Sequence, residues 1–353
     1  MATIEIATKI TNDEVIEIKV LVIGDPHFKT DNIVECEEMT RKLVKLAQSI
    51  LPTFIVVLGD VLHRHEKIHV IPLMKAEKMI RLLSEIAPTF VLIGNHDRPN
   101  NSTYLTDEHP FNALKLWPNT YIVDNSVKQI TVNNKKFLFL PYVYPGLFIN
   151  TLEHPEKGVK SNDNYHDTVA IFCHQEFYGA QMGIIKSQAG DKWPLSNPLA
   201  ISGHIHDYDR PQENIIYVGT PYQDGYSDNI SKTVSLFTFD NSGYKEDRID
   251  LGLVKKVLIH LSVNEIHDYQ PPTDKMIKII IKGDDASLKS ISKLEKIKEW
   301  KKMGIKIAYK AIISSEVEIK KGPTLKLTYK DRLYVTVCKD LSELAWFNKL
   351  FHV

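Results

Sequence analysis

The stretch VLVIGDPHF at residues 20–28 decides the fold, because its apolar run stops at Gly24 and is followed at once by Asp25 and His27. A short apolar run bounded by turn residues is typical of a buried β-strand. Four later runs also end in Asp, Asn or His: FIVVLGD (54–60), FVLIGNHD (90–97), VAIFCH (169–174) and LAISGHIH (199–206). Ligands collect beyond the carboxyl ends of such strands, so the pattern predicts one shared site.

Helical patterns separate the first three of these runs. Apolar residues recur at helical spacing over residues 33–50 and 70–86, which is typical of strands alternating with helices in an α/β fold. Hairpin patterns follow at 118–140, and strands return at 215–219 and 233–240. We predict a mixed α/β (α+β) fold, in which two mixed β-sheet layers form a sandwich and helices flank it.

The chain has no net charge, but its charges are unevenly distributed. Residues 255–353 carry 20 Lys and Arg against 12 Asp and Glu, whereas residues 1–254 carry 24 against 32. A basic region favours contact with a polyanion such as nucleic acid, and a solvated lysine-rich surface is the alternative. The candidate DNA-binding residues are the pairs Lys301–Lys302 and Lys320–Lys321.

The basic region also has its own pattern of elements. A strand at 275–283, a helical stretch at 286–303 and a strand at 304–313 predict a small α/β unit. The segment Gln270-Pro271-Pro272-Thr273 is the expected linker before it, and residues 141–167 are expected to form a long polar loop. We predict a catalytic domain at 1–254 and a basic cap domain at 255–353.

Composition is that of an ordinary soluble protein, with 43% hydrophobic and 25% charged residues. Three widely spaced cysteines, Cys36, Cys173 and Cys338, indicate a reducing environment rather than a disulfide framework. No run approaches the roughly 18 apolar residues that span a bilayer, and the N-terminus lacks a secretory pattern. We expect a soluble intracellular protein without a membrane partner.

The residue types at the strand ends suit a two-metal centre. A carboxylate such as Asp60 can bridge two cations, and the amide of Asn95 adds a neutral oxygen ligand. A mixture of imidazole, carboxylate and amide favours Mn²⁺, Fe or Zn²⁺ over Mg²⁺. The candidate ligands are Asp25, His27, Asp60, Asn95, His174, His204 and His206.

The five blocks resemble those of the calcineurin-like metallophosphoesterase superfamily. The matching segments are GDPHF (24–28), GDVLH (59–63), GNHD (94–97), His174 and GHIH (203–206), and the resemblance spans roughly residues 18–240. It implies a first divalent metal on Asp25, His27, Asp60 and His206, and a second on Asp60, Asn95, His174 and His204. It also implies that His96 protonates the leaving oxygen and that Asp97 orients His96.

Within the superfamily, the chain resembles one branch more than another. Phe28 replaces a glycine of the protein phosphatases, and Asp97 replaces their glutamate. His63, three residues after Asp60, resembles the GD-x-F-H block of the SbcD-type nucleases of double-strand-break repair. The segment IYVGTPYQDGYSD (216–228) is similar to their Y-x-G-[ST]-P motif.

The SbcD-type resemblance implies a catalytic role for His63 at the scissile phosphate, with Mn²⁺ as the expected metal. It implies DNA and an SMC-like ATPase as partners, with residues 341–353 as the candidate docking segment. Packing of that segment in the core of the small domain is the favoured alternative. Residues 70–86 and 109–117 match the region through which family members form a homodimer. His65 and His69, near the second block, are expected to be surface residues, and contact with DNA phosphate is the alternative.

The leading hypothesis is therefore a two-metal-dependent DNA nuclease, an exonuclease or endonuclease of DNA repair, recombination or replication. Water activated by the metals would hydrolyse the phosphodiester. The alternative is a metallophosphoesterase of small phosphodiesters or phosphomonoesters. A third hypothesis, a scaffold that has lost its metals, is disfavoured because every ligand position is intact.

Overall fold

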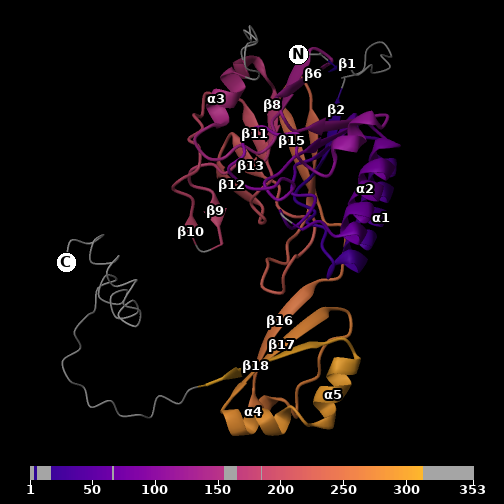
Figure 1. Cartoon of the computed structure of the whole chain (residues 1–353), viewed down its shortest axis with the longest axis vertical. Coiled ribbons are helices and arrows are strands. Elements are labelled where there is room, and N and C mark those ends of the chain that lie inside the picture. The colour runs from indigo at the N-terminus through magenta and orange to yellow at the C-terminus, as the bar shows by residue number, and fades with distance from the viewer. Residues whose placement is uncertain (1–3, 6–16, 66, 155–164, 184, 313–353) are drawn as a thin grey trace, which may run out of the picture.

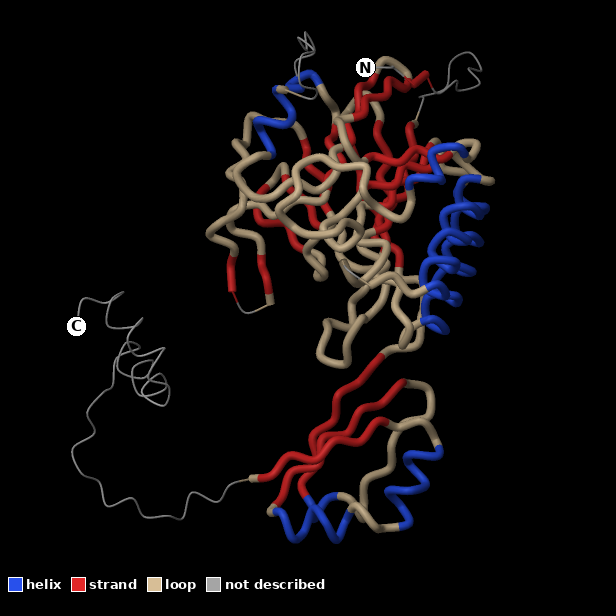
Figure 2. Tube along the Cα trace, viewed as in Figure 1, coloured by secondary structure: helices blue, strands red, loops and turns tan. Residues whose placement is uncertain are grey.

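The structure is a computed structural model that describes residues 4–5, 17–65, 67–154, 165–183 and 185–312. Two large β-sheets form the main body, and a three-stranded sheet with two helices lies below it in Figure 1. Figure 2 shows the strands at the centre of the main body and the helices on its outside. This mixed α/β sandwich flanked by helices confirms the predicted fold class.

The first large sheet has six strands in the order β15-β14-β2-β3-β4-β5. The strands β2 to β5 are parallel, whereas β14 at one edge pairs antiparallel with both β2 and β15. Every residue of β3 and β4 is buried, as expected where layers cover both faces of a parallel sheet. The strands are β2 (Ile18–Ile23), β3 (Phe54–Val57), β4 (Thr89–Leu92), β5 (Thr120–Val123), β14 (Val234–Phe239) and β15 (Tyr244–Ile249).

The second large sheet has seven strands in the order β1-β6-β7-β8-β11-β13-β12. Asn133 and Asn134 join β6 to β7 with φ of 47° and 61°, the geometry of a tight two-residue hairpin turn. The hairpin of β6 and β7 confirms part of the pattern predicted over residues 118–140. The first strand of that stretch, β5, does not join the hairpin and pairs with β4 in the six-stranded sheet. The strands are β1 (Ile4–Glu5), β6 (Lys128–Val132), β7 (Lys135–Phe139), β8 (Ala170–Cys173), β11 (Leu199–Ser202), β12 (Asp209–Gln212) and β13 (Ile215–Tyr217). A separate two-stranded ribbon contains β9 (Gln181–Met182) and β10 (Ile185–Lys186).

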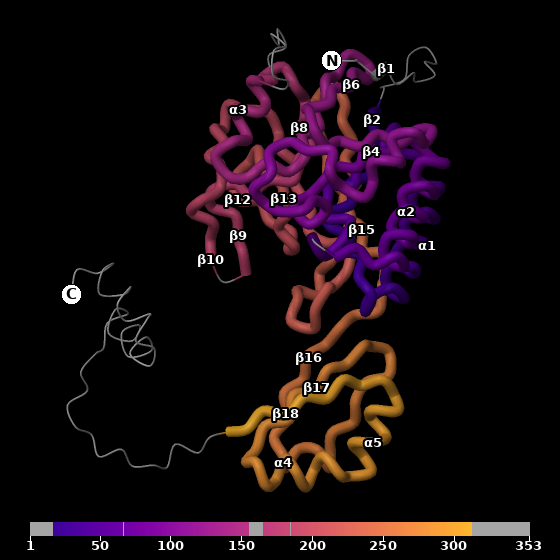
Figure 3. The backbone as a smooth tube through the Cα atoms, in the orientation of Figure 1, coloured from indigo at the N-terminus to yellow at the C-terminus, as the bar shows by residue number. Residues whose placement is uncertain are grey.

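Two long helices, α1 (Ile33–Ile50) and α2 (Val70–Ser84), cover the outer face of the six-stranded sheet. They lie side by side (Figure 3), and their buried apolar residues confirm the predicted helical periodicity. Within the part of the chain that the structure describes, no helix is long and apolar enough to cross a membrane. The 3-10 helices are η1 (Asn112–Leu116), η2 (Tyr165–Asp167) and η3 (Val263–Glu265).

A short helix, α3 (Phe148–Glu153), lies where a polar loop was expected. Its Phe148 is buried, with its ring 5.1 Å from that of Phe177 and 5.2 Å from that of Trp193. A six-residue helix is too short to show a periodic pattern, so contacts from distant parts of the chain decide this element.

The space between the two large sheets is filled by aromatic side chains. The ring of Phe54 lies edge-on to those of Phe90, Phe137 and Phe172, with centroids 5.8, 5.4 and 6.0 Å away. All four side chains are completely buried. Edge-to-face aromatic pairs add stability beyond the area they bury. This core sets how the strand ends of the two sheets face each other.

The third sheet contains three parallel strands, β16 (Lys256–Ser262), β17 (Met276–Gly283) and β18 (Lys306–Ala311). The helices α4 (Asp285–Ile291) and α5 (Glu295–Lys302) pack on one face and form a separate core with it. The expected single helical stretch is thus two helices. Gln270–Thr273 joins β16 to β17 inside this unit, so its assignment as a linker before the unit was wrong. The domain boundary at residue 254 stays a prediction.

We expect Phe54→Ala to lower the free energy of unfolding by about 3–5 kcal/mol, because it opens a cavity between the sheets. Urea denaturation followed by circular dichroism measures this change. Leu195→Ala is the control, since that side chain is 66% exposed, and surface substitutions usually stay within about 0.5 kcal/mol. A loss below about 1 kcal/mol in Phe54→Ala would contradict the assigned core.

Candidate metal centre

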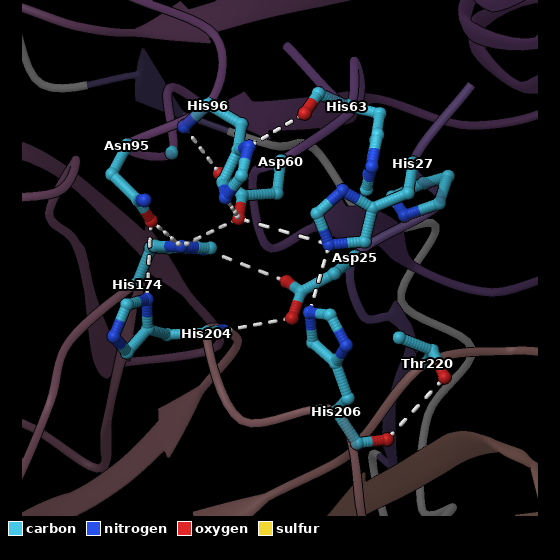
Figure 4. A network of polar contacts seen from close by, with 12 residues as sticks. Asp25, His27, Asp60, His63, Asn95, His96, His174, His204, His206 and Thr220 are labelled. Carbon is cyan, nitrogen blue, oxygen red and sulfur yellow. Dashed lines mark hydrogen bonds and ion pairs between the residues drawn. The ribbon is translucent and has the colours of Figure 1, made fainter. Parts of the chain in front are cut away.

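The predicted ligands come together where five strands end. Asp25 follows β2, Asp60 follows β3, Asn95 follows β4, His174 follows β8, and both His204 and His206 follow β11. Figure 4 shows these side chains converging from separate segments. The structure therefore brings together all seven residues that the sequence nominated as ligands.

Glycines before the ligands leave room for close approach. A Cβ atom on Gly94 would lie 2.2 Å from Asp60 Oδ1, and one on Gly203 would lie 2.4 Å from Asp25 Oδ1. The backbone also turns sharply here, since His27, Asp60 and His204 have φ of 45°, 47° and 78°. Non-glycine residues in this conformation are strained, and such strain concentrates at functional sites.

Asp25, His27 and His206 form the first group of candidate ligands, with one ligand atom of each within 4.8 Å of the others. The Nε2 atoms of His27 and His206 are 2.9 Å apart. Asp25 Oδ2 accepts the backbone N–H of His204 at 2.9 Å, but Asp25 Oδ1 is buried without a hydrogen-bond donor among the described residues. Leaving a buried carboxylate oxygen unpaired is costly, so this group fits a cation.

Asp60, His174 and His204 form the second group. Asn95 belongs with them, because its Oδ1 lies 3.0 Å from His174 Nε2 and 3.1 Å from His204 Nδ1. Asp60 Oδ1 accepts the backbone N–H of His96 at 2.8 Å. Asp60 Oδ2 lies 3.4 Å from His174 Nε2 and 3.8 Å from His27 Nε2, between the two groups. Asp60 is therefore placed to bridge two metals.

Burial prepares two of the histidines as neutral ligands. It lowers the pKa of both His27 and His204 to about 3, so that each imidazole keeps a free lone pair at pH 7. Burial also raises the pKa of Asp25 to about 6. Burial opposes ionisation of Asp60 as well, but His174, His27 and His96 hold the pKa of its carboxyl well below the ordinary value.

His174 is the positive counterpart of these carboxylates. Burial opposes its protonation, yet the charges of Asp60 and Asp25 raise its pKa to about 9. Its Nδ1 lies 2.8 Å from the carbonyl oxygen of Leu58, which directs Nε2 toward Asp60 and Asn95. A metal bound to Nε2 would replace the proton on that atom, and its charge would offset those of Asp60 and Asp25. The donor set and its charges thus fit divalent cations.

His96 lies at the edge of the centre with a side chain that is 30% exposed. Its Nδ1 is 2.7 Å from the carbonyl oxygen of His63, and its Nε2 is 3.9 Å from Asp60 Oδ2. The His63 ring lies 5.2 Å from that of His27, and burial lowers the pKa of His63. The His96 ring also lies 5.2 Å from that of His27, so both predicted catalytic histidines are beside this ligand of the first group.

Asp97 differs from the expectation that it orients the His96 ring. It accepts the backbone N–H groups of Val61, Leu62 and Gly94 at 3.1, 2.8 and 3.1 Å. Burial raises its pKa to about 7 despite these bonds. Among the described residues no hydrogen bond joins Asp97 to His96. Asp97 fixes the loops after β3 and β4, and the His63 carbonyl orients His96.

The position of His65 beside the metal centre was not predicted from the sequence. It was expected on the surface, but it is half-buried and its ring stacks on His96 at 4.6 Å with an angle of 20°. Its only sequence signal is that it follows His63 by two positions in one loop. His69, by contrast, is exposed before α2, as expected.

Asn32 and Tyr222 support the loop that carries His27. Asn32 Nδ2 donates to the carbonyl oxygen of His27 at 2.8 Å, and the Tyr222 hydroxyl donates to that of Pro26 at 2.8 Å. Neither residue was nominated from the sequence, although Tyr222 lies within the segment IYVGTPYQDGYSD.

Basic residues line two hollows beside His63. One cavity of about 230 Å³ includes Lys29, Arg64 and Lys67 in its lining, and a second of about 580 Å³ shares Arg64 and Lys67. The nominated lysines Lys301 and Lys302 lie elsewhere, exposed at the end of α5. Lys320 and Lys321 fall outside the described residues.

Comparison with known proteins agrees with this site. The family model described as calcineurin-like phosphoesterase matches residues 18–208. "Putative phosphoesterase 078R" of Invertebrate iridescent virus 3 is 36% identical over 307 residues, covering 85% of this chain and 86% of that protein. "Putative phosphoesterase 244L" of Invertebrate iridescent virus 6 is 38% identical over 284 residues, covering 78% and 97%.

The chain therefore belongs to the calcineurin-like phosphoesterase family, and it is a metal-binding phosphoesterase, a hydrolase. Among solved structures, "GAP50 the anchor in the inner membrane complex of Plasmodium" is 14% identical, with a TM-score of 0.41 over 67% of this chain and 85% of that one. That likeness is too distant to bear on function.

We expect two divalent metals per chain after loading with Mn²⁺, and one after either His204→Ala or His206→Ala, because each removes a ligand from one group only. Asp60→Asn should weaken both sites, since its carboxylate lies between them. Elemental analysis of the desalted protein measures the content, with His267→Ala as the control. Two retained metals in both ligand variants would contradict the assignment.

Proposed function

We propose that this protein is a metal-dependent DNA nuclease of the SbcD type, acting in DNA repair, recombination or replication. The observation that carries the proposal is His63, which lies beside both His27 and His96 at the metal centre. The basic hollows next to it support contact with a chain of phosphates. Arg64 and Lys67 form no ion pair with any residue that the structure describes.

Two bound divalent cations, with Mn²⁺ as the proposed metal, would supply Lewis acidity and an activated water for attack on phosphorus. The chain's own residues would do the rest. His96 would donate its Nε2 proton to the leaving oxygen, and the His63 carbonyl on Nδ1 would stabilise the imidazolium. His63, whose ring lies 5.8 Å from that of His96, would contact a non-bridging phosphate oxygen beside this acid.

A small phosphodiester is the second candidate substrate. The cavity of about 230 Å³ beside His63 approaches the volume of a small-molecule site, and its basic lining would suit any phosphate. Both viral relatives are named as phosphoesterases without mention of nucleic acid.

We expect the protein to degrade linear DNA in the presence of Mn²⁺, and His96→Ala to lose about 10²–10⁴-fold in rate because the leaving oxygen goes unprotonated. Blunt, overhanging and hairpin DNA are compared with bis-p-nitrophenyl phosphate, with and without metal. His267→Ala is the histidine control. Digestion of DNA by His96→Ala at the wild-type rate would contradict the assignment of His96 as the acid. Hydrolysis of the small diester without cleavage of any DNA would favour a small phosphodiester as the substrate.

We further propose a homodimer through α2. Its first turns expose Val70, Ile71 and Met74 by 69%, 58% and 58%, and Leu116 in the other predicted contact segment is 88% exposed. Clusters of exposed apolar side chains of this kind often mark protein interfaces. The candidate docking segment for an SMC-like ATPase, residues 341–353, lies outside the described residues, and that partnership stays a proposal.

We expect the double variant Ile71→Lys with Met74→Lys to be monomeric where the wild type is dimeric, because two buried charges would disrupt an apolar interface. Light scattering after gel filtration measures the mass. Val34→Lys is the control, since that side chain is 77% exposed on α1 outside the proposed contact. A wild type that remains a monomer at high concentration would refute the dimer.

A further inference from the structure

His206 is the one exposed residue among the seven candidate ligands. Its Nε2 lies 2.9 Å from that of His27, and among the described residues its ring makes no other hydrogen bond. His174 contrasts with it, because the Leu58 carbonyl oxygen at 2.8 Å directs the His174 ring toward the centre. The position of the His206 imidazole must therefore come from its own main chain.

Two residues from later in the chain hold the carbonyl oxygen of His206. Thr220 donates its backbone N–H at 3.0 Å, and its hydroxyl lies 3.3 Å away; Figure 4 shows Thr220 beside this oxygen. Lys232, just before β14, donates its ammonium to the same oxygen at 2.6 Å. Hydrogen bonds from a charged donor are shorter and roughly twice as strong as neutral ones. Lys232 therefore supplies the strongest single contact to this main chain.

The segment that carries Thr220 also packs closely against the main chain at His206. Gly219 has φ of 71°, and a Cβ atom there would lie 3.0 Å from the His206 carbonyl oxygen and 2.8 Å from the Tyr208 backbone nitrogen. A larger residue at this position would push the two segments apart. The main chain at His206 is therefore fixed both by close packing and by the Lys232 ammonium.

Lys232 is unusual because its side chain is almost completely buried. It is 3% exposed, although lysine is almost never fully buried unless it is paired. Its ion-pair partner is Asp207, whose Oδ1 lies 2.7 Å from the ammonium. Asp207 directly follows His206, so Lys232 binds two consecutive residues of the segment after β11. Burying an ammonium is costly, and the described contacts that offset this cost all go to the segment that carries a metal ligand.

Lys256 shows what a buried lysine does when it supports the fold alone. It is also buried, and its ammonium donates to the carbonyl oxygens of Gln223 and Asp224 at 2.9 and 3.2 Å. Neither of those residues is a candidate ligand. Lys232 differs because the main chain that it holds belongs to a candidate ligand itself.

We propose that Lys232 is a positioning residue for the first group of ligands. By holding the carbonyl oxygen of His206 it fixes the imidazole beside His27, and so sets the affinity of that group for a divalent cation. His204, two residues earlier, is held instead by its own backbone N–H, which Asp25 Oδ2 accepts at 2.9 Å. The second group is therefore independent of Lys232. This inference needs only the metal-binding phosphoesterase and does not rest on the proposed nuclease.

The test measures Mn²⁺ affinity by isothermal titration calorimetry in two backgrounds that each retain one group. His204→Ala retains the first group, and His206→Ala retains the second. In the His204→Ala background we expect Lys232→Met to weaken Mn²⁺ binding by about 10–100-fold, the usual effect of losing a contact that orients a metal ligand. In the His206→Ala background the affinity should stay within about twofold, as for independent sites.

Leu152→Ala controls for a general loss of stability. Leu152 is buried in a different core cluster, and its truncation costs about 2–5 kcal/mol without touching the ligands. It should leave the Mn²⁺ affinity unchanged in both backgrounds. Thermal unfolding checks that each variant folds, and Lys232→Gln, which is shorter and uncharged, replaces Lys232→Met with the same expectations if the latter does not fold.

Two results would overturn the inference. One is an unchanged Mn²⁺ affinity in the His204→Ala background, which would mean that Lys232 does not position His206. The other is equal weakening in both backgrounds, which would mean that Lys232 supports only the fold. Neither result depends on whether the protein cleaves DNA, so the proposed nuclease is tested separately.

Discussion

The structure depends on the burial of two carboxylates among imidazoles. Asp60 Oδ2 lies between His27 and His174, and Asp25 Oδ1 is buried with no hydrogen-bond donor among the described residues. Charges removed from water are stable only when others offset them. Asp60 and Asp25 raise the pKa of His174, whose positive charge offsets theirs, and bound divalent cations would offset them in the same way. The strained backbone at His27, Asp60 and His204 is maintained because it brings these groups together.

The aromatic core is what makes this arrangement possible. The rings around Phe54 hold the six- and seven-stranded sheets face to face, and the ligands come from both. A shift of one sheet against the other would separate Asp60 from His174. The glycines at positions 94 and 203 set the remaining distance, because any Cβ there would collide with a ligand carboxylate. The packing between the two sheets therefore determines both the stability of the fold and the distances among the metal ligands.

Local patterns were sufficient to predict much of the molecule. The helix over residues 33–50, the buried strands and all seven candidate ligands follow from periodicity and from the residues that end each run. Other features have no local signal. Asp97 was expected to orient His96 but accepts backbone N–H groups, and His65 was expected on the surface but stacks on His96. The prolines at 271 and 272 resemble a linker, yet they connect two strands of one sheet.

The sequence by itself determined which chemical groups end the strands, and hence that a metal-binding phosphoesterase was expected. Only the tertiary structure decided that Asp60 lies between the two ligand groups, that the Leu58 carbonyl directs His174, and that Lys232 holds the main chain at His206. The physical reason is distance along the chain. His174 and Leu58 are 116 positions apart, and Lys232 and His206 are 26 positions apart. Such contacts are set by packing, which no short stretch of sequence records.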